Sequence, residues 1–289
     1  MALEDIGPTP SEYIRKHLVH LTNKEQDFIV DFTVINIDSV VVSSLLGALI
    51  CFVMWRIVRH ASAGVPGRFQ AAFELLVEYV DQQAKANIRN AASRKVIAPM
   101  ALVVALWVFM MNAMDLIPVD LFPHIWGTVG PALGLPHYLR VVPTASLATT
   151  LGLAFAVLLM CLYYNIKIKG WGGWGHELVS APFGTSKNIF IAIPLGIFNF
   201  SMQVIEYIAK TVSHGMRLFG NMFAGELVFM LIALLGGFAA LSLGGGFLFL
   251  GHLIAGTAWA IFHIFVITLQ AFIFMMLALI YLGQAHDAH

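Results

Sequence analysis

Residues 189–235 have the sequence IFIAIPLGIFNFSMQVIEYIAKTVSHGMRLFGNMFAGELVFMLIALL, and this stretch decides the class of fold. It is almost continuously apolar, has no proline after Pro194 and is rich in residues that favour a helix. A single helix over these 47 residues would be about 70 Å long. The hydrocarbon core of a membrane is only about 30 Å thick, so such a helix must lie nearer the membrane plane than its normal. The alternative is two ordinary spans joined by a loop at residues 210–221. Three glycines in or near this loop support the alternative.

The composition of the chain shows what kind of protein holds this stretch. Of its 289 residues, 59% are apolar and 11% are charged, and the mean hydropathy is +0.83. An average soluble domain carries about 25% charged residues, because it needs a polar surface around its core. The formal net charge is zero, so there is no excess of Lys and Arg for binding phosphates. The composition therefore excludes a soluble enzyme, a disordered protein and a nucleic-acid binder, and it predicts a polytopic membrane protein.

Three apolar runs upstream are long enough to cross a membrane, at residues 40–58, 96–118 and 142–164. The segment 68–92 differs, because its apolar residues recur every three or four positions with charged residues between them. Such a pattern is typical of an amphipathic helix that lies in the membrane interface. Residues 1–36 are polar, and the proline- and glycine-rich residues 119–141 and 170–175 predict loops.

The distribution of Lys and Arg predicts the orientation of the chain. If residues 56–95 and 165–188 face the cytoplasm, ten of these cations lie on that side and four on the other. We therefore expect the N-terminus to face outward. The ten are Arg56, Arg59, Arg68, Lys85, Arg89, Arg94, Lys95, Lys167, Lys169 and Lys187, and the four are Arg15, Lys16, Lys24 and Arg140.

The long apolar stretch carries ionisable residues into the membrane, where they are costly and usually mark an ion or proton path. Arg217 has no acidic residue within one helical turn, which points to a functional role. On a helix, Glu226 lies about 180° away from Arg217. His263 and Gln270 are seven residues apart and share one face of the next helix. The residues within about 40° of the Arg217 line are Gln203, Glu206, Lys210, Ser213 and Asn221.

These side chains suit a proton conductor, because Glu and His relay protons whereas Arg keeps its proton. Arg217 can therefore attract and discharge a carboxylate without passing the proton on. Structural alternatives stay open for the other residues. Glu206 and Lys210 are four residues apart and can neutralise each other. His214 can lie at the membrane interface, and His263 can be a core histidine with a hydrogen-bond partner.

Motifs near the C-terminus resemble subunit a of bacterial F-type ATP synthases. They are Arg217-Leu-Phe-Gly-Asn-Met-Phe-Ala-Gly-Glu226, Ala260-Ile-Phe-His263 and Thr268-Leu-Gln270-Ala-Phe. Supporting stretches are Gly64-Val-Pro-Gly-Arg-Phe-Gln70 and Met111-Asn-Ala-Met-Asp115-Leu-Ile-Pro-Val-Asp120. The resemblance covers about residues 34–283 of the chain.

The resemblance implies an all-α polytopic membrane protein with five membrane-crossing helices, of which the last two are long and strongly tilted. The expected spans are 39–59, 96–118, 142–166, 188–235 and 247–284. One in-plane amphipathic helix is expected at residues 68–92. Residues 1–36 then form an outward-facing polar segment, and residues 37–289 form a single transmembrane domain.

The resemblance also implies a function, that of a stator subunit beside a rotating ring of c subunits. Protons would reach the ring carboxylate through two offset half-channels, and their flow would drive rotation and ATP synthesis. Arg217 matches the arginine that faces the ring carboxylate, and Asn221 the asparagine beside it. Glu226 and His263 match the relay of the outer half-channel, and Gln270 the polar residue opposite the arginine.

This chain departs from the family pattern around the inner half-channel. Lys210-Thr-Val-Ser213 lacks the usual proline, Gln203 replaces a glutamate, and His214 stands where an apolar residue is usual. Glu206 is displaced by three residues from the family glutamate. Residues expected to line the half-channels are Gln203, Glu206, Lys210, Ser213, His214, Asp115 and Asp120.

The partners implied are the c-subunit ring, the b-subunit stator stalk, the rest of the F1Fo complex and the lipid bilayer of the bacterial inner membrane. We expect a periplasmic N-terminus, a cytoplasmic C-terminus, no cofactor or metal ion, and no catalytic site in this chain. A phosphate-binding Gly-x-x-x-x-Gly-Lys-[Ser/Thr] loop is missing, so ATP chemistry belongs to partner subunits. One alternative is a secondary transporter that holds an anionic substrate with Arg217, although the chain lacks repeated halves. Another is transport of Na⁺ instead of H⁺, but the pair of Glu226 and His263 favours protons.

Overall fold

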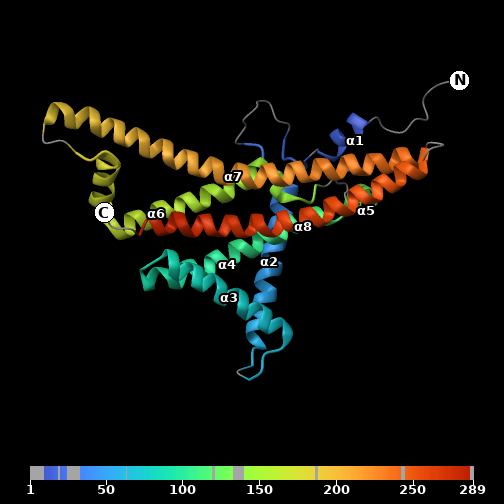
Figure 1. Ribbon diagram of the computed structural model, residues 1–289, viewed down its shortest axis with the longest axis horizontal. Coiled ribbons are helices and arrows are strands. Elements are labelled where there is room, and N and C mark those ends of the chain that lie inside the picture. The colour runs from blue at the N-terminus through green and yellow to red at the C-terminus, as the bar shows by residue number, and fades with distance from the viewer. Residues whose placement is uncertain are drawn as a thin grey trace. The chain divides into compact units, whose positions relative to one another are not determined.

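The computed structural model describes residues 10–18, 20–24, 33–62, 64–118, 121–132, 140–185, 188–241 and 245–286. Over these residues the chain forms a series of helices, five of which are long and apolar enough to cross a membrane (Figure 1). The all-α polytopic fold is therefore confirmed. The helices are α1 (Pro10–His17), α2 (Ile37–Arg59), α3 (Arg68–Asn87), α4 (Ala91–Ala113), α5 (Leu121–Ala132), α6 (Leu147–Ser180), α7 (Ile189–Leu241) and α8 (Gly245–Gln284).

Helix α7 runs without interruption through the long apolar stretch of residues 189–235. Its 53 residues make it about 80 Å long. The two-span alternative is wrong, because the proposed loop at residues 210–221 is helical. Two of the glycines have packing roles instead: a Cβ on Gly215 would lie 2.8 Å from Leu151 Cδ2, and one on Gly225 would collide with the His263 ring. Glycine costs about 1 kcal/mol in a helix relative to alanine, but here it lets a neighbouring side chain approach.

Two segments that were expected to be loops are helical. Helix α5 occupies much of the expected loop 119–141. Proline is tolerated in the first turn of a helix, where the missing N–H costs no internal hydrogen bond, so Pro123 does not prevent α5 from forming. Helix α6 also continues past the expected loop 170–175 to Ser180, with a kink at Gly170. Gly170 has φ 69°, a left-handed conformation that glycine adopts without steric cost, so one residue turns the chain and the helix resumes.

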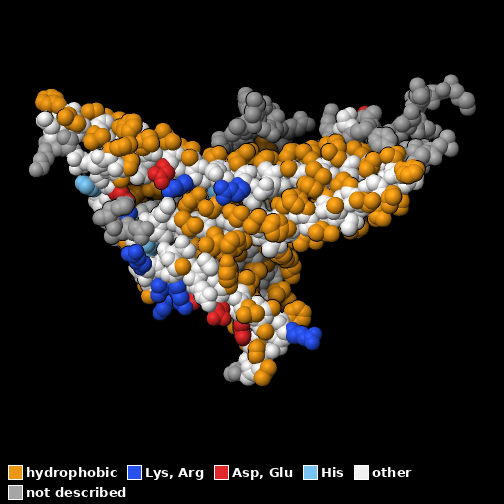
Figure 2. Space-filling model, in the orientation of Figure 1, with side chains coloured by type: hydrophobic (Ala, Val, Ile, Leu, Met, Phe, Trp, Pro, Cys, Tyr) orange, Lys and Arg blue, Asp and Glu red, His pale blue; other side chains and the backbone are white. Residues whose placement is uncertain are grey.

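The chain divides into two compact units, which are described separately. Unit 1 comprises Met1–Met54, Leu106–Thr149 and Leu218–Ala271. Within it, the C-terminal part of α7 and the first part of α8 form an antiparallel hairpin (Figure 1). His252 Nδ1 lies 2.7 Å from the Ile232 carbonyl oxygen, and the Phe229 ring packs edge-on against His263. Hydrophobic side chains predominate over charged ones on the face of this hairpin that Figure 2 shows, which suits a segment surrounded by lipid or by other apolar helices.

Unit 2 comprises Trp55–Ala105, Thr150–Arg217 and Phe272–His289. In it, α3 packs against the end of α8, where a Cβ on Gly283 would lie 2.6 Å from the Asn87 carbonyl oxygen. The core of this unit includes Val80, Ala84, Ile88, Leu279 and Leu282, which are buried. The amphipathic segment expected at residues 68–92 is thus a helix that ends at Asn87, and its position in the membrane plane stays a prediction.

Candidate functional site

Unit 1 buries a pair of opposite charges that are far apart in the sequence. Arg140 donates two hydrogen bonds to the Glu226 carboxylate, one from Nε to Oε1 at 3.2 Å and one from Nη2 to Oε2. Arg140 follows α5, and Glu226 projects from α7. Two parallel bonds between a guanidinium and a carboxylate fix the orientation of both groups and are stronger than bonds between neutral groups. The pair therefore holds Glu226 in one place inside the protein.

A second buried pair in unit 1 joins Asp115 and His263. His263 Nε2 lies 2.7 Å from Asp115 Oδ2, and both side chains are almost fully enclosed. Asp115 belongs to the short 3₁₀ turn Met114–Leu116 that follows α4. The rings of Phe229 and Trp259 flank the imidazole of His263. His263 is therefore a core histidine with a carboxylate partner, and Asp115 also interacts electrostatically with Glu226 and Arg140.

The remaining members of this group come from the N-terminal part of the chain. Arg140 Nη1 lies 2.7 Å from His20 Nε2, and His20 Nδ1 lies 3.4 Å from Asp38 Oδ2. Asp38 also accepts hydrogen bonds from the backbone N–H groups of Leu21 (3.0 Å) and Ser39 (2.7 Å). We call His20, Asp38, Asp115, Arg140, Glu226 and His263 the unit 1 cluster. It connects titratable groups from five separate segments of the chain.

Sequence analysis did not identify His20, Asp38 or Arg140 as parts of the site. Arg140 was counted only as a charge outside the cytoplasm, and Asp38 was not singled out. Arg140 is 86 residues from Glu226 and 120 residues from His20, so no local spacing reveals the group. The one available signal was that Arg140 must find an anion if it is enclosed among apolar neighbours.

Asn221 and Gln270, also in unit 1, are brought together as a pair. Asn221 Nδ2 donates a hydrogen bond to Gln270 Oε1 at 2.8 Å. Asn221 is exposed, whereas Gln270 is buried. The pair links α7 to α8 through side-chain amides, which bind protons only in strong acid and so act by orienting neighbours.

Arg217 lies in unit 2, on the exposed face of α7. Ser213, which lies one turn before Arg217 on the same side of the helix, is also exposed. Among the residues that the structure describes, none forms a hydrogen bond or an ion pair with the Arg217 guanidinium. Glu226, on the same helix, is buried, as expected from its position about 180° from Arg217. The guanidinium is therefore exposed on α7 and has no anionic partner among the described residues.

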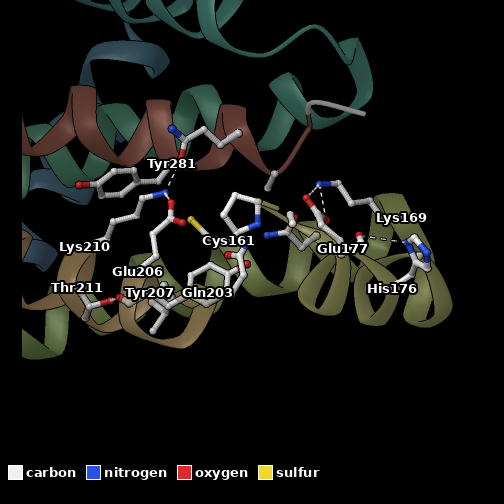
Figure 3. A pocket seen from close by; sticks show the side chains of 18 of the residues that line it. Cys161, Lys169, His176, Glu177, Gln203, Glu206, Tyr207, Lys210, Thr211 and Tyr281 are labelled. Carbon is white, nitrogen blue, oxygen red and sulfur yellow. Dashed lines mark hydrogen bonds and ion pairs between the residues drawn. The ribbon is translucent and has the colours of Figure 1, made fainter. Parts of the chain in front are cut away.

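Unit 2 contains a cavity of about 1010 Å³ between α6, α7 and α8 (Figure 3). Ion pairs line it: Lys169 Nζ lies 2.7 Å from Glu177, and Lys210 Nζ lies 2.6 Å from Glu206. Lys210 also donates a hydrogen bond to Gln284 at 2.8 Å. The alternative in which Glu206 and Lys210 neutralise each other is thus realised, although both also border the cavity.

His214 forms part of the wall of the same cavity. It is 2% exposed, and neither of its ring nitrogens has a hydrogen-bond partner within the part of the chain that the structure describes. Its ring packs against Phe274, with 3.9 Å between the ring centroids. His214 is therefore enclosed by protein, and its depth in the membrane stays a prediction. Gln203 lines the cavity, Ser213 is exposed outside its lining, and Asp120 lies outside the described residues.

The buried pair of Arg140 and Glu226 gives a direct prediction for stability. Arg140→Leu leaves the Glu226 charge enclosed without its partner, so we expect the free energy of unfolding to fall by about 3–5 kcal/mol. Replacing both residues by leucine should restore most of this loss. The measurement is thermal unfolding of the purified protein. Lys85→Ala is the control, because its exposed pair with Asp81 should contribute at most about 1 kcal/mol. Equal losses in the single and double variants would contradict the prediction.

Comparison with known proteins decides the family. The family model described as ATP synthase A chain matches residues 40–283. The chain belongs to this family. It is 68% identical to ATP synthase subunit a of Paracidovorax citrulli over the full length of both chains. It is also 42% identical to ATP synthase subunit a of Psychrobacter cryohalolentis, with 96% of each chain covered.

Family membership confirms the resemblance found in the sequence. It makes the chain a component of an F1Fo ATP synthase, and the five apolar helices make it a multipass membrane protein. The transporter alternative is therefore set aside. The ATP synthase A chain match covers all of the residues that were singled out in the membrane, from Asp115 to Gln270.

Proposed function

We propose that the chain is the stator subunit that carries protons through two half-channels to and from the carboxylate of a rotating c-ring, so that proton flow drives rotation and ATP synthesis. The observation that carries this proposal is Arg217. It is an exposed cation on a long, mainly apolar helix, and no described residue of its own chain pairs with it. A charge removed from water needs an opposite charge, which must then come from another subunit. A carboxylate on the ring meets this need.

The outer half-channel is assigned to the unit 1 cluster. Its support is that Glu226, His263 and Asp115 are titratable, buried and close to one another. A neutral imidazole relays H⁺ and offers nothing comparable to Na⁺, so the pair of His263 and Asp115 favours protons. Asn221 and Gln270 join α7 to α8 in the same unit through their amide hydrogen bond.

The inner half-channel is assigned to the cavity of unit 2. Its support is the cavity's volume of about 1010 Å³ and its lining by Gln203, Glu206, Lys210 and His214. A water molecule occupies about 30 Å³ of liquid, so a polar cavity of this size holds a chain of waters along which protons can move. The ion pairs in its wall keep it polar.

The topology completes the proposal. Helix α7 is more than twice as long as the hydrocarbon core is thick, about 80 Å against about 30 Å, so it tilts strongly if it stays in the membrane. Helix α3 lies in the interface, because its apolar and charged residues alternate with helical period. The Lys and Arg distribution places the N-terminus in the periplasm and the C-terminus in the cytoplasm. A b-subunit stalk holds the chain still while the ring turns.

Proton conduction by the membrane sector tests this function. Membrane sectors that contain this chain, the c-ring and the stalk should conduct protons when they are reconstituted into vesicles. Blocking the ring carboxylate with a carbodiimide should stop conduction, because the proton must pass through that group. Sectors that conduct equally well without this chain would overturn the proposal.

His214 supplies a prediction for the inner half-channel. His214 borders the cavity together with Glu206, Lys210 and Tyr281, and Arg217 lies one turn further along the same helix. We expect His214→Leu to flatten the dependence of ATP-driven pumping on inner pH, because it removes a titratable group from the path. His60→Leu is the control, since His60 is exposed and lies outside the cavity. A pH profile of His214→Leu that matches the wild type would leave His214 without a role in proton transfer.

A further inference from the structure

Two titratable members of the unit 1 cluster, His20 and Asp38, have no role yet in the proposed outer half-channel. We propose that His20 is the outermost proton-relay residue of this pathway, so that the N-terminal segment is a working part of the half-channel. This inference rests on the proposed function and adds a residue to it. The one structural observation behind it is that His20 touches both Arg140 and Asp38 at the edge of the cluster.

Exposure distinguishes His20 from the other members. Its side chain is 18% exposed, against 0% for Asp38, 5% for Arg140, 7% for Glu226, 2% for Asp115 and 1% for His263. A proton that arrives from water therefore meets His20 before any other titratable group of the cluster. The others are reached only through the protein.

The contacts of the ring are those of a relay. Arginine donates hydrogen bonds and accepts none, so His20 Nε2 accepts from Arg140 and the ring's single hydrogen lies on Nδ1, toward Asp38. A hydronium ion can protonate Nε2: an N–H bond forms, a water molecule is left, and the bond from Arg140 is lost. The proton then passes from Nε2 through water to the Glu226 carboxylate. An O–H bond forms there, the N–H bond of His20 breaks, and Arg140 keeps its own protons throughout.

The neighbours of His20 in the cluster include both kinds of charged group. Asp38 lies beside Nδ1, and Arg140 lies beside Nε2 and holds the Glu226 carboxylate on its other side.

Backbone hydrogen bonds hold His20 in this position. The N-terminal segment pairs with the residues that lead into α2: Ile37 N–H donates to the Leu21 carbonyl at 2.8 Å, and Asn23 N–H donates to the Ile35 carbonyl at 3.3 Å. The N–H of Leu21 donates to Asp38, the residue that His20 faces. The segment is thus attached to the start of α2 directly after His20.

His20→Gln tests the relay. The amide oxygen of glutamine can accept the hydrogen bond from Arg140, but glutamine does not pass protons. We expect at least a tenfold fall in proton conduction per assembled complex, both in passive conduction after removal of the F1 sector and in ATP-driven pumping. His252→Gln is the matched control, because His252 is in the same unit and its ring nitrogen Nδ1 contacts a backbone carbonyl. Conduction by the control should equal that of the wild type.

Chemical rescue separates a relay from a purely structural role. In His20→Ala complexes, imidazole added on the outer side should restore conduction, and imidazole added only on the inner side should not. Wild-type conduction in His20→Gln, or a loss in His20→Ala that outer imidazole leaves unchanged, would overturn the proposal. Arg217→Ala in the same vesicles distinguishes a failure of the relay role of His20 from a failure of the proposed function. If it loses pumping while His20→Gln does not, the relay role of His20 fails and the proposed function stands.

Discussion

Arg217→Lys should abolish coupling between proton flow and rotation, even though it keeps the positive charge. The ring carboxylate must ionise as it passes the stator, and a fixed cation in a medium of low dielectric stabilises its ionised form. Arginine does this without releasing its proton, and its planar fork matches a carboxylate. Lysine is a point donor that can lose its proton when it is desolvated, which would let protons pass between the half-channels. Each proton that leaks across 100 mV dissipates about 2.3 kcal/mol.

The measurement is acidification of inverted membrane vesicles on addition of ATP, with passive proton leak recorded in parallel. We expect at least a tenfold fall in acidification for Arg217→Lys. We expect a larger leak for Arg217→Ala, since nothing then separates the two half-channels. Arg68→Lys is the control, because Arg68 is exposed in α3. Wild-type acidification by Arg217→Lys would show that any positive charge suffices.

Replacing Glu226 or His263 should slow pumping at least tenfold while ATP hydrolysis by the detached F1 sector is unchanged. Both residues are buried titratable groups on the proposed outer path, with Arg140 and Asp115 as their partners. Because Glu226 contacts Arg140, the choice of substitution at Glu226 decides whether a loss of pumping can be interpreted. Glu226→Leu leaves a buried guanidinium without its anion, so a loss of pumping could reflect misfolding. Glu226→Gln keeps an acceptor for Arg140 and removes only the titratable carboxylate.

Pumping is therefore measured for Glu226→Gln and His263→Ala at equal amounts of assembled complex. Glu74→Gln is the control, because Glu74 is an exposed carboxylate of α3. Near-normal pumping in both Glu226→Gln and His263→Ala would remove these residues from the proton path.

The long helix shows where local sequence is sufficient and where it is not. Its apolar length and helical period predicted a long membrane helix with Arg217 and Glu226 on opposite sides, and one is exposed while the other is buried. Its continuity was open, because glycine is unfavourable in an isolated helix. Packing resolved it: Gly215 lies against Leu151, and Gly225 lies against His263. These neighbours come from other helices, so no window along α7 contains them.

Helix α5 and the kink of α6 are two further cases in which residue type alone did not predict the local structure. Proline and glycine mark loops on average, but Pro123 lies in a first turn and Gly170 turns the chain within a single residue before the helix continues. In both cases the residue type was recognised correctly and its consequence depended on position within the helix.

Local hydrophobicity, helical period and motif spacing were sufficient to predict the membrane class, the apolar helices and the family. The tertiary structure was needed to find what surrounds the buried titratable groups. It joined Arg140 to Glu226 and His20 across 86 and 120 residues, and it enclosed His214 in the wall of a cavity. The physical reason is that a buried charge pairs with an opposite charge close to it in space, whichever segment supplies it. The free-energy cost of an unpaired buried charge destabilises the whole fold, so it does not depend on neighbours in the sequence.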